Sequence, residues 1–221
     1  MIKKKYIAII LCIVIIGCIT TYWTINTSSK ETLPIFTAEF FPGYLSDNSK
    51  NMNTHFIQDF SFKNQLNQRV TQKILDDKIT VVSFFYANCT LVCPTIIRKL
   101  QTVQKNILDK NNIQILSITI TPSVDTPAVL KSYANENHIH PDKWQLLTGN
   151  IEDTVRFARE SFFGLTPDQN KWNQNIHSET LFLVDSNKQI RGIYNATQTN
   201  DIKNLIADIY LLSKKNPRLI Y

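Results

Sequence analysis

The sequence predicts a mixed α/β domain with a largely parallel sheet, preceded by an apolar N-terminal helix. Two continuous apolar runs, ITVVSFFY at 79–86 and IQILSITI at 113–120, are rich in β-branched and aromatic residues, which is typical of strands covered on both faces. Helical patterns follow each run, and strands that alternate with helices pair in parallel. The third observation is a charge-free stretch from Tyr6 to Ile25, since about 20 apolar residues can cross a bilayer as a helix.

The elements of the first half follow in order. Alternating apolar and polar residues on both sides of 64–67 predict a short N-terminal hairpin. Apolar residues recur at helical spacing from Pro94 to about Lys110, which predicts the first helix after the 79–86 strand. The helix after the 113–120 strand is expected to open near Asp125, with Pro127 tolerated in its first turn.

The second half continues the alternation. The segment WQLLTG at 144–149 predicts a third strand, and Asn150 is a suitable N-cap for a helix that ends near Gly164. TLFLVD and QIRGIYN, joined by residues 186–188, predict an antiparallel hairpin, and an amphipathic helix is expected at 201–214. This element order is that of a thioredoxin-like fold with an added N-terminal β-hairpin.

Composition indicates one globular domain with attachments. The chain has 221 residues, of which 43% are hydrophobic and 19% charged. Three of its net +6 charges come from Lys3, Lys4 and Lys5, and the mild remainder forms no basic stripe, so we expect no nucleic-acid partner. We expect an anchor or signal segment at 1–25, a polar lead-in at 26–54, the thioredoxin-like domain at 55–214 and a tail at 215–221. Nothing in the sequence suggests more than a monomer.

The N-terminal segment predicts attachment to a membrane. Lysines precede the apolar stretch and none stand at its end, which predicts a cytoplasmic N-terminus and an exported domain. The segment IIGC resembles a bacterial lipoprotein cleavage box, in which Cys18 would become the lipidated N-terminus. Tyr22 and Trp23 instead suit the interfacial end of an uncleaved helix, which we favour. Both alternatives hold the domain at the outer, extracytoplasmic face of the same membrane.

The exported part of the chain contains two cysteines, in ANCTLVCPT. Cys89 follows a predicted buried strand, and Cys93 lies at or in the first turn of the next helix. Two cysteines are too few for a disulfide framework, so a chemical role is favoured. A helix N-terminus stabilises thiolate, and we expect a lowered cysteine pKa here. Helical spacing leaves Cβ atoms about 5–6 Å apart, so a modest adjustment would allow a disulfide. The pair alone does not distinguish a metal site from a redox site.

A metal site needs a further ligand, and the chain offers four histidines. His55 directly follows the lead-in, and a polar turn beside Pro141 explains His138 and His140. His177 stands at the end of a long polar loop, just before the strand expected at 180. Open α/β sheets build their sites at the carboxyl ends of strands and in the adjoining connections, so this loop can reach the cysteines. A solvated loop histidine is an equal alternative.

Three segments, in this order and spacing, resemble the Sco/SenC family of copper proteins. VVSFFYANCTLVCPT is similar to the family's strand and C-x-x-x-C-P motif, ILSITITPSVDTP to its D-P-x-x-D-T-P turn, and NIHSETLFLVD to its D-H-[ST] before a strand. The resemblance extends from about His55 to Leu212. It implies a thioredoxin fold with a copper site of two thiolates and one imidazole, which by position are Cys89, Cys93 and His177. Such ligands suit Cu(I), and with one further weak ligand also Cu(II).

The resemblance implies a membrane-tethered copper chaperone. Its acceptor would be the binuclear copper centre of cytochrome c oxidase subunit II, or another copper protein. The alternative is a thiol–disulfide oxidoreductase that uses Cys89 and Cys93 as a redox pair and keeps the cysteines of that or another exported protein reduced. This role does not need His177, and it leaves open whether the protein is an enzyme. A peroxidase is disfavoured, because no proline–threonine pair precedes Cys89.

The chain departs from the family pattern at two positions. Thr121 stands where the family usually has Asp, and Ile176 stands where Asp commonly precedes the histidine. We expect these departures to affect copper affinity or partner choice, because residues around a metal site tune its ligands. Asp125 and Asp185 match the remaining family acids, although a role as turn or cap residues explains both.

Overall fold

The computed structural model describes residues 13–22, 32–37, 40, 55–89, 92–163 and 179–215. Two compact units are present, Met1–Leu33 and Pro34–Tyr221. The elements of the second unit are β1 (Ser61–Asn64), β2 (Arg69–Thr71), a 3-10 turn (Gln72–Leu75), β3 (Ile79–Phe85), α2 (Cys93–Ile107), β4 (Ile113–Thr119), α3 (Pro127–Glu136), β5 (Trp144–Thr148), α4 (Ile151–Phe162), β6 (Thr180–Val184), β7 (Ile190–Asn195) and α6 (Thr199–Lys215). This is the order predicted from the sequence.

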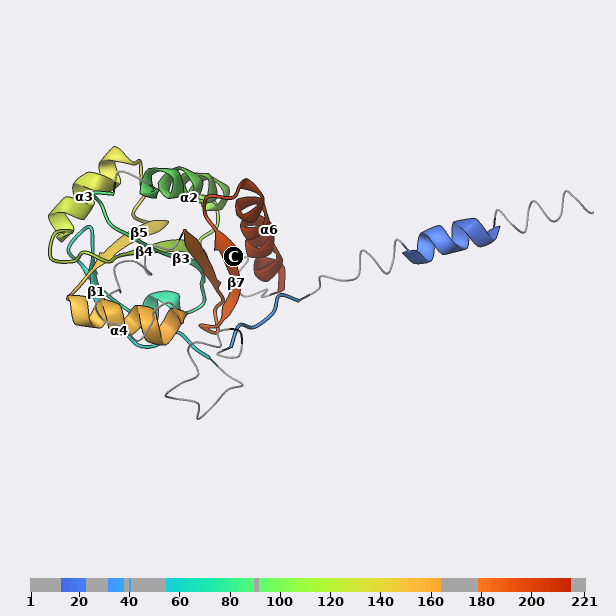
Figure 1. The fold of residues 1–221 in the computed structure, drawn as a ribbon, viewed down its shortest axis with the longest axis horizontal. Helices are drawn as coiled ribbons and strands as arrows, with labels where there is room; N and C mark the ends of the chain where they lie inside the picture. The colour runs from blue at the N-terminus through green and yellow to red at the C-terminus, as the bar shows by residue number, and fades with distance from the viewer. Residues whose placement is uncertain are drawn as a thin grey trace, which may run out of the picture. The chain divides into compact units, whose positions relative to one another are not determined.

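In the described part of the chain these strands form one sheet of seven, in the order β2-β1-β5-β4-β3-β6-β7 (Figure 1). The central strands β3, β4 and β5 are parallel, as their connection through helices requires. The added hairpin pairs antiparallel with β5, and the β6–β7 hairpin pairs antiparallel with β3. The architecture is therefore the predicted mixed α/β, thioredoxin-like fold with a hairpin at one edge.

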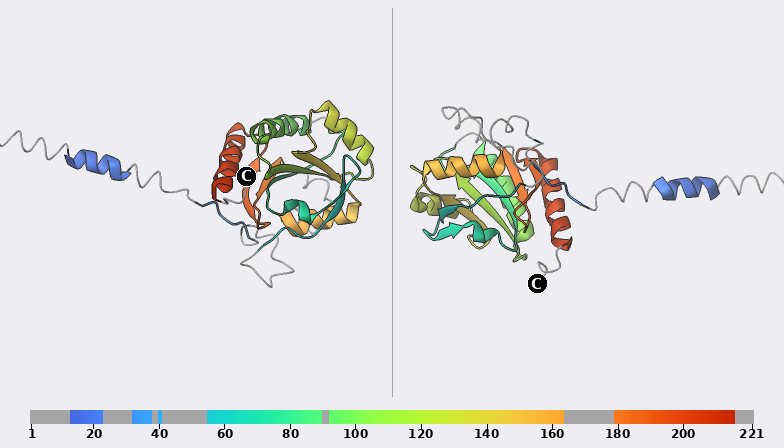
Figure 2. Two further views of the ribbon diagram at one scale, coloured as in Figure 1. Left: turned by 180° about the vertical axis from the view of Figure 1, so that it is seen from behind. Right: turned by 90° about the horizontal axis from the view of Figure 1, so that it is seen from below.

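Helices cover the sheet on both faces. Helices α2, α3 and α6 lie on one face and α4 lies on the other (Figures 1 and 2). Every residue of β3 and β4 is buried, as expected for strands covered on both sides. Phenylalanine rings fill the space between α4 and the sheet, with centroid distances of 4.7 Å for Phe60–Phe157 and 4.8 Å for Phe162–Phe182. These contacts fix α4 against the sheet.

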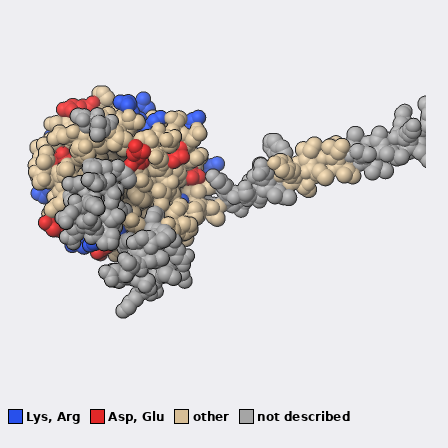
Figure 3. Space-filling model, in the orientation of Figure 1, with Lys and Arg blue, Asp and Glu red and all other residues tan. Residues whose placement is uncertain are grey.

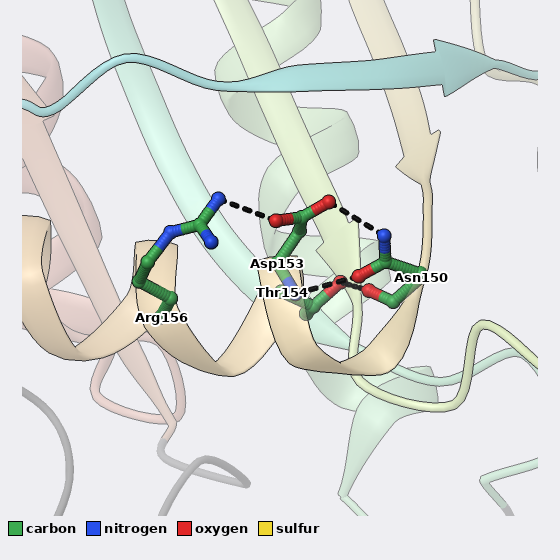
Figure 4. Close-up of polar contacts among 4 residues, drawn as sticks. All are labelled: Asn150, Asp153, Thr154 and Arg156. Carbon is green, nitrogen blue, oxygen red and sulfur yellow. Dashed lines mark hydrogen bonds and ion pairs between the residues drawn. The ribbon is translucent and has the colours of Figure 1, made fainter.

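Helix α4 begins where the sequence predicts. The side chain of Asn150 accepts a hydrogen bond from the backbone N–H of Asp153 at 2.6 Å, which satisfies a donor that the helix leaves unpaired (Figure 4). The Asn150 amide in turn donates to the Asp153 carboxylate, which also pairs with Arg156. The hydroxyl of Thr154 donates to the Asn150 carbonyl at 2.8 Å. The cap is thus closed by reciprocal side-chain bonds.

The other end of α4 differs from the prediction. The helix ends at Phe162, just before the predicted end, and Phe163 adopts the left-handed conformation, with φ of 52°, in which a glycine is usual at a helix C-terminus. Gly164 lies outside the described residues. A bulky residue rarely takes this conformation, but the Phe163 ring is only 8% exposed and lies 4.0 Å from the ring of His55. Burial of the ring offsets the cost of the backbone conformation.

The predicted membrane segment falls only partly on described residues. Residues 13–22 form a helix, whereas 1–12 and 23–25 lie outside the described part of the chain. Within that part, no helix combines the length and the apolar character needed to cross a membrane. Most of the predicted lead-in and residues 216–221 also lie outside it.

Charged side chains are interspersed on the described surface. Small groups of basic and acidic residues alternate on the face shown in Figure 3. A mixed distribution of this kind gives that face no strong potential of one sign.

Candidate metal centre

The two cysteines flank the connection between β3 and α2. Strand β3 ends at Phe85, and the backbone N–H of Cys89 donates to the Tyr86 carbonyl at 3.3 Å, which closes a tight turn. Cys93 is the first residue of α2 and Pro94 the second, a position where the missing N–H of proline costs no helical bond. Both placements agree with the sequence prediction. We call residues 86–89 the cysteine turn.

Both cysteines are buried, and neither forms a disulfide. Cys89 is 8% exposed and Cys93 is 4% exposed. The Cys89 thiol lies within hydrogen-bonding reach of Cys93. The fold therefore brings two soft sulfur donors together at the carboxyl end of β3. The spacing of the cysteines in the sequence permitted this proximity but did not require it.

The pKa of Cys93 is opposite to our prediction. Burial, together with the hydrogen bond to Cys89, raises the pKa of the Cys93 thiol to about 12. Backbone hydrogen bonds at Tyr86 and Cys93 favour the thiolate but do not outweigh the loss of hydration. The expectation that the helix N-terminus lowers this pKa was wrong, because it neglected how deeply the helix start is buried. The raised pKa favours the thiol form of Cys93 at neutral pH, and a metal ion that binds the sulfur displaces the proton.

Two tyrosines complete the surroundings of the thiols. A hydrogen bond to Cys89 is the main cause that raises the pKa of Tyr86 to about 12. Tyr133 reaches the site from α3, where its ring lies 5.6 Å from that of Phe85. Burial, with smaller contributions from Cys93 and Cys89, raises the pKa of Tyr133 above its ordinary value.

Sequence reasoning missed both tyrosines. Tyr86 directly precedes the cysteine motif, so its place at the end of a buried strand was an available signal. Tyr133 has no such signal, because it comes from a helix about 40 residues further along the chain and only the folded topology brings it to the thiols.

The two family acids differ in their surroundings. Asp185 is a turn residue, as predicted, whose carboxylate accepts from the backbone N–H groups of Asn187 at 2.9 Å and Gln189 at 3.0 Å. Asp125 is 1% exposed, and its carboxylate accepts a hydrogen bond from the backbone N–H of Ala87 at 3.1 Å. It therefore contacts the cysteine turn, which its reading as a local turn residue did not foresee.

The predicted third ligand, His177, lies outside the described residues, as does Ile176. The start of β6 nevertheless indicates where the preceding loop returns to the sheet. Strand β6 runs antiparallel to β3 with Leu181 opposite Ser83, so Thr180 enters beside the carboxyl end of β3. That is the end of the sheet from which the cysteine turn emerges.

His138 and His140 both contact helix α2 through their backbone groups. His138 has a positive φ of 52° in the turn after α3, and its carbonyl accepts from the Gln104 amide at 3.0 Å. The backbone N–H of His140 donates to Gln104 at 2.9 Å. These contacts are those of a polar turn, as predicted. Among the side chains that the structure describes, no three His, Cys, Asp or Glu residues are grouped so that they could hold a metal ion.

Comparison with known proteins identifies the family. The SCO1/SenC family model matches residues 48–212. The SCO1 protein homolog of Bacillus subtilis is 26% identical over 155 residues, which cover 69% of this chain and 80% of the relative.

Solved structures share the fold. BsSco, described as having a disulfide switch and as a member of the Sco family of cytochrome c oxidase assembly proteins, is 25% identical with a TM-score of 0.64, over 74% of this chain and 96% of that one. A SCO1/SenC family lipoprotein from Bacillus anthracis is 27% identical with a TM-score of 0.64, over 76% and 99%. Yeast Sco1 with copper bound is 24% identical with a TM-score of 0.57, over 75% and 98%. The chain belongs to the SCO1/SenC family.

Proposed function

We propose that this protein binds one copper ion through Cys89 and Cys93 and delivers it to an exported acceptor during the assembly of cytochrome c oxidase. The observation that carries the proposal is the convergence of the two buried thiols at the end of β3. Membership of the SCO1/SenC family, which includes a copper-bound relative, supports copper as the ion.

The donor set fits Cu(I). Thiolates are soft ligands that select Cu(I), whereas a structural zinc site normally needs four protein ligands. We assign the third ligand to His177, which stands three residues before Thr180. The register of β6 against β3 supports this assignment, because it returns the preceding loop to the sheet end that carries Cys89. The same ligands with one further weak donor would hold Cu(II).

Copper binding displaces protons from the two sulfurs, and one Cu(I) in exchange for two protons makes the site one unit more negative. Binding of Cu(I) by both sulfurs releases two thiol protons, and the raised pKa of Cys93 means that its proton is present until the metal arrives. Transfer then proceeds by ligand exchange, in which an acceptor ligand replaces each sulfur in turn and the departing thiolate regains a proton. Copper is never free during such an exchange. The acceptor we propose is the binuclear copper centre of cytochrome c oxidase subunit II.

We further propose that the domain works at the outer face of a membrane. Three lysines precede the apolar segment from Tyr6 to Ile25, a charge pattern that places the N-terminus inside. A lipid on Cys18 would give the same placement, and the Bacillus anthracis relative is a lipoprotein.

A second candidate is a thiol–disulfide oxidoreductase, which the same proximity of thiols favours. Its step would be exchange between the Cys89–Cys93 dithiol and a disulfide of an exported protein. One S–S bond forms here while one breaks in the partner, and two electrons with two protons pass to the partner. The disulfide switch described for BsSco makes this the natural competitor.

A Cu(I) titration separates the two functions. The full chain, purified in mild detergent with reduced thiols, is titrated without oxygen against a coloured Cu(I) chelator. We expect one copper per chain, a loss of about a hundredfold or more in affinity for Cys89→Ser and Cys93→Ser, and a loss of about tenfold for His177→Ala. His140→Ala is the matched control and should bind as the wild type does, because His140 is exposed in a polar turn.

Two outcomes would change the conclusion. Stoichiometric binding that is unaffected by His177→Ala would remove His177 from the ligand set. A wild-type chain that fails to compete for Cu(I), yet reduces a model protein disulfide through Cys89 and Cys93, would favour the oxidoreductase.

A further inference from the structure

The turn that follows β4 contains a carboxylate with almost no contact with water. Asp125 is 1% exposed, and burial of a charge is costly unless hydrogen bonds replace its hydration. One oxygen, Oδ2, accepts three bonds: from the backbone N–H of Ala87 at 3.1 Å, from the hydroxyl of Thr121 at 3.0 Å and from the hydroxyl of Thr119. The other oxygen, Oδ1, is buried without a hydrogen-bond partner among the described residues. A buried carboxylate with one oxygen unsatisfied needs an explanation beyond local stability.

The bond to Ala87 joins two turns that are far apart in the sequence. Ala87 precedes Asp125 by 38 positions and stands two residues before Cys89. The regular pairing of β3 with β4 ends at Phe85 opposite Thr119, and the N–H of Ile120 donates to the Phe85 carbonyl at 2.9 Å. The Asp125 bond continues the connection between the strands past the last ladder pair, so it fixes the backbone of the cysteine turn to the sheet.

A role in starting helix α3 does not explain these contacts. The N-cap of α3 is Thr126, whose side chain accepts from the N–H of Val129. The bonds that Asp125 accepts within its own turn come from the side chains of Thr119 and Thr121, and its backbone donor is Ala87. Asp125 is therefore directed at the cysteine turn and not at the helix that follows it.

Thr121 also acquires a function from this arrangement. The family usually has Asp at this position, which would place a second carboxylate beside Asp125. In this chain the Thr121 hydroxyl instead donates to Asp125, and its backbone N–H donates to the Thr119 hydroxyl at 3.0 Å. The two threonines thus hydrogen-bond Oδ2 of Asp125, the same oxygen that holds Ala87.

We propose that Asp125 is a positioning residue for the cysteine pair, which acts through the backbone of Ala87 to hold Cys89 against Cys93. The inference rests on the proposed function in taking this pair as the functional site. Both a two-sulfur copper site and a disulfide require the sulfurs to be held in a narrow range of distance. A turn that is fixed in advance loses less freedom when either bond forms, so copper binding and disulfide formation are both favoured.

The test measures two properties of the full chain for the wild type, Asp125→Asn and Asp125→Ala. The first is Cu(I) affinity against a competing chelator. The second is the equilibrium with oxidised dithiothreitol in the absence of metal. In that reaction two electrons and two protons leave the Cys89–Cys93 dithiol, one S–S bond forms in the protein and one breaks in the reagent.

We expect Asp125→Ala to lower both the Cu(I) affinity and the disulfide equilibrium constant about tenfold, which corresponds to about 1.4 kcal/mol. Asp125→Asn keeps an oxygen that can accept from Ala87, although more weakly because it is uncharged, and it should lower both constants about threefold. If Asp125→Ala does not fold, the Asn variant decides, and constants equal to those of the wild type would contradict the proposal.

Asp185→Ala is the matched control. Asp185 is also a buried turn carboxylate, 5% exposed, with two backbone donors, but its donors are Asn187 and Gln189 rather than the cysteine turn. It should lose stability while both constants stay at their wild-type values. An equal shift in this control would show a general effect of lost stability and overturn the positioning role. A wild-type chain that binds no Cu(I) would instead refute the proposed function, and the disulfide equilibrium alone would then test Asp125.

Discussion

The hydroxyl oxygens of Ser83 and Ser117 lie 2.7 Å apart on the adjacent parallel strands β3 and β4, where both residues are buried. Ser117 also accepts a hydrogen bond from the indole N–H of Trp144 at 2.8 Å, and Trp144 is fully buried. A polar chain of three side chains therefore crosses β3, β4 and β5 inside the core.

These two hydrogen bonds predict that similar substitutions at Ser83 and Ser117 lower the free energy of unfolding by different amounts. Ser117→Ala leaves the buried Trp144 N–H and the Ser83 hydroxyl without partners, and we expect it to lower the free energy of unfolding by about 2–3 kcal/mol. Ser83→Ala keeps the Trp144–Ser117 bond and should cost about 1 kcal/mol. Urea denaturation measures both, and equal costs would contradict the role given to Trp144.

Two ion pairs of similar length should contribute differently to the stability of the fold. Arg191 and Asp185 lie 2.7 Å apart with side chains 17% and 8% exposed, whereas Lys188 and Asp76 lie 2.8 Å apart with side chains 26% and 52% exposed. Arg191→Met leaves a buried carboxylate without its cation and should destabilise the fold by about 2–3 kcal/mol. Lys188→Met should cost less than about 1 kcal/mol, since water screens that pair. Denaturation curves of the two variants provide the comparison.

The stability of the protein should depend on pH through His55. Burial lowers the pKa of His55 from its ordinary value, although its Nε2–H donates to the Ser161 carbonyl at 2.9 Å, which opposes the shift. The unfolded chain therefore takes up a proton at a higher pH than the folded chain does. The contribution of His55 is complete above the ordinary pKa of about 6.5 and is lost as the pH falls toward its lowered pKa in the folded state.

Measurement of unfolding free energy between about pH 7.5 and 5 tests this dependence. His55→Gln removes the titrating group, so the loss of stability on acidification should be smaller in the variant than in the wild type. Parallel curves for the two proteins would show that His55 is not responsible.

The reactivity of the cysteine pair should respond to Tyr86. The Tyr86 hydroxyl hydrogen-bonds Cys89, and a donor of this kind stabilises a thiolate more than a thiol. Tyr86→Phe should therefore raise the pH midpoint for alkylation of Cys89 by roughly one unit. Tyr133→Phe is the matched control, because burial rather than a bond to a thiol is the main cause of its raised pKa. An equal shift in both variants would assign the effect to a change in packing.

The fold was predictable wherever the signal was local. Continuous apolar runs identified β3 and β4, since strands buried on both faces have no polar side to alternate with. Pro127 and Asn150 marked the starts of α3 and α4, because capping depends on the chemistry of the residues beside the helix end. Cys89 and Cys93 were placed at the strand end and the helix start by the same reasoning.

Features that depend on distant parts of the chain were not predictable. The left-handed conformation of Phe163 is stabilised by a ring contact with His55, which is more than 100 residues away in sequence. The raised pKa of Cys93 follows from burial beneath other elements, and the bond from Ala87 to Asp125 joins two separate turns. Each feature depends on contacts between residues that are far apart in the sequence, and local residue patterns do not reveal such contacts.

The pairing of β3 has a consequence for how the site moves. This strand is interior to the sheet, paired with β4 along its whole length and with β6 from Thr80 to Ser83. Its amide hydrogens should exchange with solvent only when the whole domain opens, because such segments have the highest protection in a fold. Cys89 lies four residues after the end of this strand. We therefore expect copper binding and release to involve rotation of the cysteine side chains without local unfolding of β3.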